Sequence, residues 1–219
     1  MTVPSQQDNV VDVLGNSRLL PVIVLDDADV AADLGEAILA GGLDVAEVTL
    51  RTPNALEALR AMAEVPGLCV GAGTVLRSSQ VDEAVDAGAR FLVSPGFAPA
   101  LVRRAWSHAV PILPGVATPS EVIVTADLGV ETMKVFPAGV LGGPRMVSAL
   151  ASAFPSVRFV PTGGIGAADV ADYLALPSVL AVGGSWMVPA DLIRRRAWTE
   201  ITGLVRDAVR AAKQEGTLE

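Results

Sequence analysis

The segment DLGVETMKVFP, residues 127–137, contains the local pattern that decides the fold. It passes from the end of a predicted helix through Gly129 into a short, mostly apolar strand, and glycine at that place is typical of a helix C-terminus. The segments AGGLDVAEVTL (40–50) and DAGARFLVSPG (86–96) repeat the pattern. A chain that moves repeatedly from a helix into a buried strand is built of β-α units.

Eight short runs rich in apolar and β-branched residues predict eight strands along the chain. They alternate with segments of helical periodicity, which favours a parallel sheet covered by helices. The predicted strands span residues 19–25, 45–51, 69–75, 91–96, 111–116, 132–137, 158–164 and 180–186.

Eight β-α units in a chain of 219 residues predict one (β/α)8 TIM barrel with an extra N-terminal helix. We expect a single domain over residues 1–219, with the helix in 1–17 and the barrel in 18–219. A doubly wound open sheet is the structural alternative. The first strand, however, is followed by DDADV instead of the glycine fingerprint of dinucleotide-binding sheets. In a barrel, the active site lies at the carboxyl ends of the strands.

Two segments carry signals for the start of a helix. Thr118, Pro119 and Glu121 supply an N-cap, a proline at the first helical position and the acidic third position of a capping box. Thr52 and Pro53 repeat the first two of these features, so a second helix is expected to begin there.

Composition and charge limit the classes of partner. Apolar residues make up 51% of the chain and aromatic residues 4%, so the core is built mainly from Ala, Val, Leu and Ile. A net charge of −8 and a pI of ≈ 4.7 argue against nucleic acid or an anionic membrane as the main partner. With no signal-peptide pattern and no apolar run of about 18 residues, a cytoplasmic protein is expected. The single cysteine, Cys69, is expected in the core, and no cluster of ligands predicts a metal site.

Lys134 is unusual because it stands in a predicted strand that favours valine or isoleucine, in a chain with only two lysines. Strand alternation places Lys134 and Phe136 on one face of the sixth predicted strand, and Glu47, Thr49 and Arg51 on one face of the second. In an eight-stranded barrel these two strands face each other across the interior, so the lysine can approach Glu47.

Such a Lys–Glu pair has a structural and a catalytic interpretation. A buried ion pair can hold strands together, but it is a weak stabiliser because both charges lose water. Function explains the pair better, since burial favours the neutral form of an amine, and a neutral amine is the nucleophile that forms a Schiff base with a carbonyl substrate. Glu47 then transfers protons beside Lys134.

Glycine-rich ends of the seventh and eighth strands predict an anion site. Barrels bind phosphate at this position, where glycines allow backbone N–H groups to approach an anion and helix N-termini add partial positive charge. Either glycine pair alone is also consistent with a simple tight turn. The residues concerned are Thr162, Gly163, Gly164, Gly183, Gly184 and Ser185.

Other residues near strand ends are candidates for substrate binding. Arg51 can bind a carboxylate through two parallel hydrogen bonds, although an exposed arginine is often only solvated. Thr74 can donate a hydrogen bond into the site, and Phe136 can form an apolar wall. His108 and the run Arg194–Arg196 are expected at the surface.

Five segments together resemble the bacterial KDPG/KHG aldolase family: GLDVAEVTLR (42–51), GAGTVL (71–76), KVFPA (134–138), PTGGI (161–165) and VGGSWMVP (182–189). The resemblance implies a class I aldolase on a (β/α)8 barrel that assembles as a homotrimer. The implied reaction cleaves 2-dehydro-3-deoxy-6-phosphogluconate, a phosphorylated 2-keto-3-deoxy sugar acid, into pyruvate and glyceraldehyde 3-phosphate. No metal or organic cofactor is implied.

The resemblance also assigns roles to residues. Lys134 matches the Schiff-base lysine and Glu47 the general acid/base. The residues that match the surroundings of the pyruvyl carboxylate are Arg51, Thr74 and Thr162, and those that match the phosphate end are Gly163, Gly164, Gly184 and Ser185. The chain departs from the family pattern at GIGAAD (164–169), which is expected to change how the helix on the phosphate side begins.

Related enzymes leave several alternatives open for the reaction. They accept 4-hydroxy-2-oxoglutarate or the galactonate epimer of the same sugar acid, although the EVTLR segment (47–51) resembles the gluconate branch. A phosphate-binding barrel isomerase or synthase that uses Lys134 as an acid, without a covalent intermediate, is an alternative from another enzyme class. A ligand-binding barrel without catalysis is the third alternative.

Overall fold

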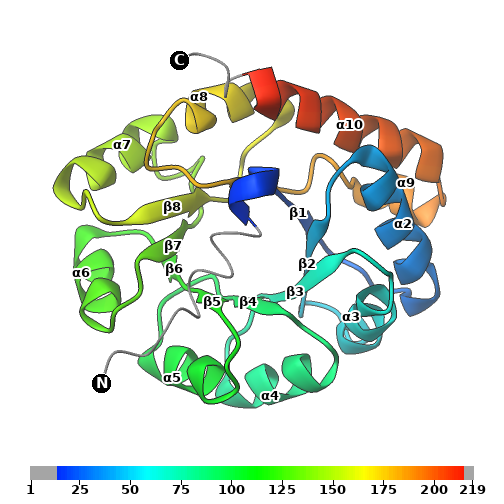
Figure 1. The fold of residues 1–219 in the computed structure, drawn as a ribbon, viewed down its shortest axis with the longest axis horizontal. Helices are drawn as coiled ribbons and strands as arrows, with labels where there is room; N and C mark the ends of the chain where they lie inside the picture. Colours follow the sequence, from blue (N-terminus) through cyan, green and yellow to red (C-terminus); the bar gives the residue numbers. More distant parts are fainter. Residues whose placement is uncertain (1–13, 215–219) are drawn as a thin grey trace.

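A computed structural model of the chain describes residues 14–214. Parallel strands curl around the centre of the molecule, and the helices lie outside them (Figure 1). The expected α/β architecture with a curled parallel sheet is therefore confirmed. Residues 14–17 are helical, as expected, and the rest of the predicted N-terminal helix lies outside the described residues.

All strand pairings between the named strands of the described chain are parallel. Six strands form one sheet in the order β5-β4-β3-β2-β1-β9, and three form another in the order β6-β7-β8. Their bounds are β1 (Leu19–Ile23), β2 (Val45–Thr49), β3 (Cys69–Gly73), β4 (Phe91–Val93), β5 (Ile112–Leu113), β6 (Gly115–Val116), β7 (Thr132–Val135), β8 (Arg158–Pro161) and β9 (Val182–Gly184).

Helices follow most of the strands, as the alternation in the sequence predicts. Two of the α-helices are directly preceded by a short 3-10 helix, η1 (Ala28–Val30) or η2 (Ala167–Asp169). The α-helices are α2 (Ala31–Gly41), α3 (Ala55–Ala63), α4 (Ser78–Asp86), α5 (Pro99–Ser107), α6 (Pro119–Asp127), α7 (Pro144–Ala153), α8 (Val170–Leu174), α9 (Ala190–Arg194) and α10 (Trp198–Gln214). No helix within residues 14–214 is long and apolar enough to cross a membrane.

The predicted fifth strand, 111–116, is divided at Pro114 into β5 and β6. Proline has no backbone N–H, so it cannot continue the ladder of hydrogen bonds on both sides. β5 pairs with β4 and β6 pairs with β7, while the Pro114 carbonyl accepts a hydrogen bond from the Lys134 N–H at 2.9 Å. The two sheets therefore adjoin at this proline. They also meet between β8 and β9, where a parallel bridge pairs Thr162 with Gly183.

Two hydrophobic clusters lie on opposite faces of the sheet, as strand alternation requires. The larger cluster fills the space between the strands and the helices. The smaller one lies inside the curl and includes Leu20, Val45, Phe91 and Val160. Cys69 is partly buried and packs against the inner cluster, so it lies at the edge of the core and its predicted place inside the core is confirmed only in part.

One of the two predicted helix starts is correct. The Thr118 hydroxyl accepts a hydrogen bond from the Glu121 N–H, and the capping box at the start of α6 is complete. The prediction for Thr52 was wrong, because α3 begins at Ala55 with Asn54 as its N-cap. The Thr52 hydroxyl instead donates a hydrogen bond to the Leu25 carbonyl in the loop after β1.

Candidate active site

One cavity of ≈ 370 Å³ lies at the carboxyl ends of β1, β2, β3, β4, β7, β8 and β9. Ten of the residues predicted to form a site line it: Glu47, Arg51, Thr74, Lys134, Phe136, Thr162, Gly163, Gly164, Gly184 and Ser185. Gly183, which also belongs to a predicted glycine-rich strand end, is not among the lining residues. The remaining lining residues are Val22, Val24, Thr49, Pro95 and Ile165. Of these, only Thr49 carried a signal in the sequence, because it alternates onto the same strand face as Glu47.

Lys134 and Glu47 meet in the wall of this cavity. The Lys134 Nζ lies 3.6 Å from the Glu47 Oε1, and the two side chains are only 6% and 1% exposed. Neither Glu47 carboxylate oxygen has a hydrogen-bond partner among the described residues. A buried carboxylate beside a buried amine is costly to maintain for stability alone, so the pair indicates chemistry.

The strands and one aromatic ring hold Lys134 in place. In the β ladder, Lys134 pairs with Gly115 of β6 on one side and with Val160 of β8 on the other. Its Nζ lies 5.2 Å from the centre of the Phe136 ring, within range of a cation–π contact. The backbone around Lys134 is therefore fixed on both sides, and the aromatic ring forms part of the cavity wall beside the amine.

The ends of β2 and β3 bring polar groups to the cavity. Thr49 is buried, and its hydroxyl donates a hydrogen bond to the Ile23 carbonyl at 2.8 Å, which ties the ends of β1 and β2 together. Arg51 lies in the turn after β2, where it is exposed and lines the cavity. Thr74 has a φ of 56°, in the left-handed region that is unfavourable for a β-branched residue. The chain turns sharply there, at a residue that lines the cavity.

Gly163 and Gly164 form the turn after β8. Their φ angles of 93° and 71° lie in the left-handed region, which glycine adopts without strain. A Cβ at Gly163 would lie 2.9 Å from the Phe136 ring, so this glycine also leaves room for the aromatic wall. Farther along, Gly166 donates its N–H to the Asp169 carboxylate at 2.8 Å. The helix on this side thus begins as the 3-10 turn η2, at the GIGAAD departure.

The glycines of β9 allow close packing against neighbouring side chains. A Cβ at Gly183 would lie 2.4 Å from the Thr162 Oγ1, and a Cβ at Gly184 would lie 1.8 Å from the Trp186 ring. Both glycines are therefore required by space at these positions. Ser185 follows them and is exposed at the rim of the cavity.

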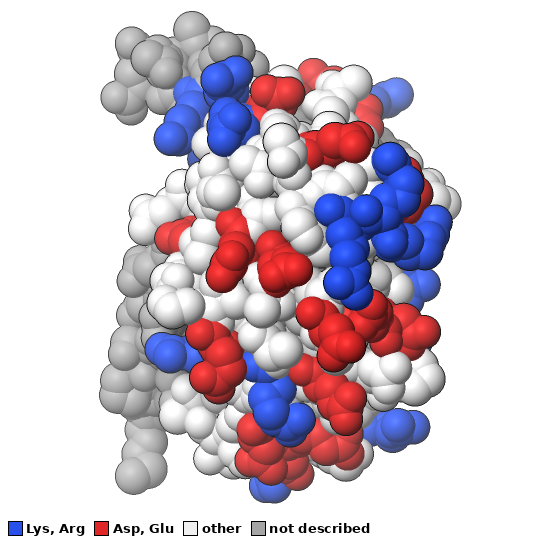
Figure 2. Space-filling model, turned by 90° about the vertical axis from the view of Figure 1, so that its right-hand side faces the viewer, with Lys and Arg blue, Asp and Glu red and all other residues white. Residues whose placement is uncertain are grey.

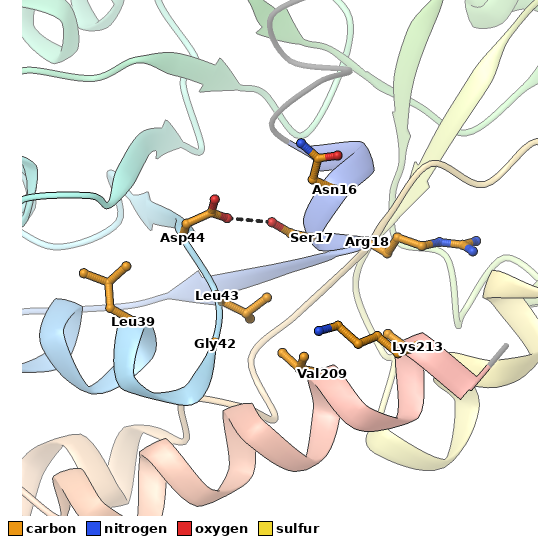
Figure 3. A pocket seen from close by; sticks show the side chains of 10 residues that line it. Asn16, Ser17, Arg18, Leu39, Gly42, Leu43, Asp44, Val209 and Lys213 are labelled. Atoms are coloured by element: carbon orange, nitrogen blue, oxygen red, sulfur yellow. Dashed lines mark hydrogen bonds between the residues drawn. The ribbon is translucent and has the colours of Figure 1, made fainter. Parts of the chain in front are cut away.

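A second cavity, of ≈ 440 Å³, lies at the opposite ends of the strands, beside the start of β1 and the last turns of α10 (Figure 3). Arg18, Asp44 and Lys213 come to it from three separate parts of the chain, and the Ser17 hydroxyl donates a hydrogen bond to the Asp44 carboxylate at 2.8 Å. None of the predicted site residues lines this cavity. The ten predicted site residues line the first cavity instead.

The arginine run at the end of α9 is exposed, as expected. Arg195 lies 3.7 Å from Asp191, and Arg196 lies 3.7 Å from Asp27. Figure 2, which views the side where α2 and α9 lie, shows basic and acidic side chains gathered next to each other on this face. The positive charge of this run is therefore partly balanced by nearby carboxylates.

His108 lies away from the cavity and pairs at the surface with Asp82. The His108 Nε2 is 2.6 Å from the Asp82 Oδ1, and the Arg104 Nε donates to the same oxygen at 2.7 Å. These contacts join α4 to the end of α5.

The comparison with known families decides the classification. A sequence model described as KDPG and KHG aldolase matches residues 10–204. The chain belongs to this family. The resemblance seen in the sequence motifs is thereby confirmed, and the protein is an aldolase, a lyase.

Relatives and solved structures agree with this membership. The KHG/KDPG aldolase of Escherichia coli K12 is 46% identical over 202 residues, which cover 92% of this chain and 95% of the relative. The 2-keto-3-deoxy-6-phosphogluconate aldolase of Zymomonas mobilis ZM4, solved with 3-phosphoglycerate, superposes with a TM-score of 0.87 at 44% identity and covers 93% of this chain and 96% of that one.

A further structure of the family shows covalent chemistry. The KDPG aldolase of Legionella pneumophila was captured with pyruvate as a covalent carbinolamine intermediate. It superposes with a TM-score of 0.87 at 42% identity, over 90% of this chain and 97% of that one. A carbinolamine is the adduct that forms when an amine attacks a ketone, and it precedes a Schiff base. The Legionella pneumophila enzyme therefore uses an amine nucleophile.

Proposed function

We propose that this protein is a class I aldolase that cleaves 2-dehydro-3-deoxy-6-phosphogluconate into pyruvate and glyceraldehyde 3-phosphate. The observation that carries the proposal is the buried pair of Lys134 and Glu47, 3.6 Å apart in a cavity lined by further polar groups. Lys134 is the nucleophile and Glu47 the group that transfers protons. No metal or organic cofactor takes part in the proposed reaction.

The reaction begins when the neutral amine of Lys134 attacks the C2 ketone of the substrate. Loss of water from the carbinolamine gives an iminium ion, which can accept the electron pair of the C3–C4 bond. Glu47 removes the proton of the C4 hydroxyl as that bond breaks, and glyceraldehyde 3-phosphate leaves. Glu47 then returns a proton to C3 of the enamine, and water releases pyruvate from Lys134.

The rest of the cavity divides into two ends. Arg51, Thr74 and Thr162 bind the carboxylate next to the ketone, with the arginine supplying paired hydrogen bonds. The backbone of the two glycine-rich turns binds the phosphate at the other end, through Gly163, Gly164, Gly184 and Ser185. The residues assigned to both ends line the same cavity, which supports this division. The smaller substrate 4-hydroxy-2-oxoglutarate fits the same chemistry without the phosphate contacts.

We also propose that the described sheets belong to one (β/α)8 barrel that forms the single domain 1–219. The shared proline between β5 and β6 and the bridge between Thr162 and Gly183 support this closure. The net charge of −8 supports a protein without nucleic acid or membrane partners. A cytoplasmic homotrimer is proposed from the family resemblance.

Borohydride reduction in the presence of pyruvate tests the covalent mechanism. The reduced adduct is mapped by mass spectrometry of peptides, and the chain contains only two lysines, Lys134 and Lys213. Attachment at Lys134, absent from the Lys134→Met variant, is the expected result. A folded protein without an adduct would refute the proposal and favour a non-covalent isomerase or synthase. Comparing kcat/KM on the gluconate and galactonate epimers then separates the two aldolase specificities.

A further inference from the structure

Strand β3 presents two glycines to the inside of the curl, Gly71 and Gly73. Neither has a φ in the left-handed region, so conformational freedom does not explain the choice of glycine at these positions. Glycine inside a strand weakens it, because it offers no side chain for packing. The remaining physical reason for glycine at these two positions is that the missing side chain leaves space for a neighbouring side chain.

The neighbour of Gly73 is the carboxylate of Glu47. A Cβ at position 73 would lie 2.0 Å from the Glu47 Oε1 and 2.6 Å from both its Cδ and Cγ. These distances are far below a van der Waals contact, and they involve three atoms of one buried side chain. A methyl group at Gly73 therefore requires Glu47 to move away from β3.

The strand register shows how this arrangement arises. Glu47 of β2 is level with Gly71 of β3, whereas Gly73 is level with Thr49. The Glu47 carboxylate nevertheless reaches Gly73, so its side chain leans two residues along the strand toward the carboxyl end of the sheet. That direction leads into the cavity where Lys134 lies.

Directional bonds contribute little to holding the carboxylate. Its two oxygens accept no hydrogen bond from the described residues, and its contact with the Lys134 Nζ is 3.6 Å long. The position of the carboxylate therefore depends on the shape of the surrounding wall, and the missing side chain at Gly73 is part of that shape.

We propose that Gly73 is a positioning residue for proton transfer: its empty Cβ position allows the Glu47 carboxylate to lie against β3, beside the amine of Lys134. This inference rests on the proposed role of Glu47 in the aldolase reaction. Gly73 contributes no atom to the proton transfer and acts only through the Glu47 carboxylate beside it. It determines where the acid/base stands relative to the bond that breaks.

The test separates two partial reactions with pyruvate. Borohydride trapping reports the bond to Lys134, and exchange of the pyruvate methyl protons in D₂O reports proton transfer by Glu47. For Gly73→Ala we expect the trapped adduct to persist while the exchange rate falls roughly 100-fold, the effect typical of misplacing a reacting group by about 1 Å. Exchange at the wild-type rate in a folded Gly73→Ala protein would overturn the inference.

Gly71→Ala is the matched control in the same strand. A Cβ there would lie 2.3 Å from the Phe91 ring, and its three nearest atoms all belong to that ring, so this change acts first on the inner hydrophobic cluster. We expect lower stability but an unchanged ratio of exchange rate to adduct formation. A fall in this ratio equal to that of Gly73→Ala would mean that any added methyl in β3 has the same effect, which contradicts the inference.

Glu47→Asp provides the second background, since its shorter side chain makes room for the methyl group. If the clash is with the Glu47 carboxylate, Gly73→Ala is expected to slow exchange less than tenfold in the Glu47→Asp protein, compared with roughly 100-fold in the wild type. The double variant is also expected to fold if Gly73→Ala alone does not. Equal losses on both backgrounds, or a double variant that fails to fold, would refute the positioning role. Failure of wild type to form the adduct would instead refute the proposed function.

Discussion

Replacing Lys134 by methionine is expected to lower the stability of the protein strongly without unfolding it. The change removes the positive partner of a carboxylate that is 1% exposed and has no hydrogen bond from the described residues. The methionine side chain fills most of the same volume, so the loss of charge, and not a cavity, dominates the effect.

The magnitude follows from the geometry of the pair. Two unit charges 3.6 Å apart interact by about 5 kcal/mol at an effective dielectric constant of about 20. Breaking a buried ion pair by removing one partner costs about 3–5 kcal/mol, because the other charge stays buried alone. Since domains are stable by about 5–15 kcal/mol, the variant is expected to fold with its urea midpoint lowered by roughly 1–2 M.

Urea unfolding followed by circular dichroism measures this difference. The control is the double variant Lys134→Met with Glu47→Met, which removes both charges and is expected to regain most of the lost stability. A single variant as stable as the wild type would refute the claim that Lys134 stabilises the buried Glu47 carboxylate. A double variant no more stable than the single one would refute it as well.

Three further predictions concern other parts of the chain. Hydrogen bonds from Arg104, the larger effect, and from His108 lower the pKa of the Asp82 carboxyl. The ionised carboxylate therefore stabilises the folded state at neutral pH, and this stabilisation is lost as the pH falls. The difference in melting temperature between wild type and Asp82→Asn is thus expected to shrink below about pH 4. Burial raises the pKa of the Cys69 thiol, so alkylation by iodoacetamide at pH 7, followed by mass spectrometry, is expected to be slower than for free cysteine. Thr118→Ala removes the N-cap of α6 and is expected to cost about 1 kcal/mol in urea unfolding.

Most of the site residues on strands could be predicted from strand alternation. Lys134 and Glu47 stand out in the sequence because charged residues are rare in buried strands, and period two then assigns them to inward faces. Val22, Pro95 and Ile165 also line the cavity, but an apolar lining residue has the same sequence pattern as a core residue. Such residues can be identified only after the strands are placed around the cavity.

The ends of strands were predicted less well than their centres. The predicted strands 19–25 and 158–164 extend past the observed ends at Ile23 and Pro161. Residues at these ends leave the ladder to form the cavity, as the left-handed φ of Gly163 shows. The division at Pro114 was missed because apolar residues on both sides of it match a single strand. Contacts across strands, such as that of Glu47 with the position of Gly73, depend on the register, which the sequence pattern does not give.

Pro114 also marks a natural crossover point for recombining this chain with its relatives. The part before it contains Glu47 and Arg51, and the part after it contains Lys134 and both glycine-rich turns. A chimera joined at this proline takes its acid/base from one parent and its nucleophile and proposed phosphate end from the other. Preference among aldehyde partners is expected to follow the parent of the second part, so inheritance of substrate range can be studied with one junction.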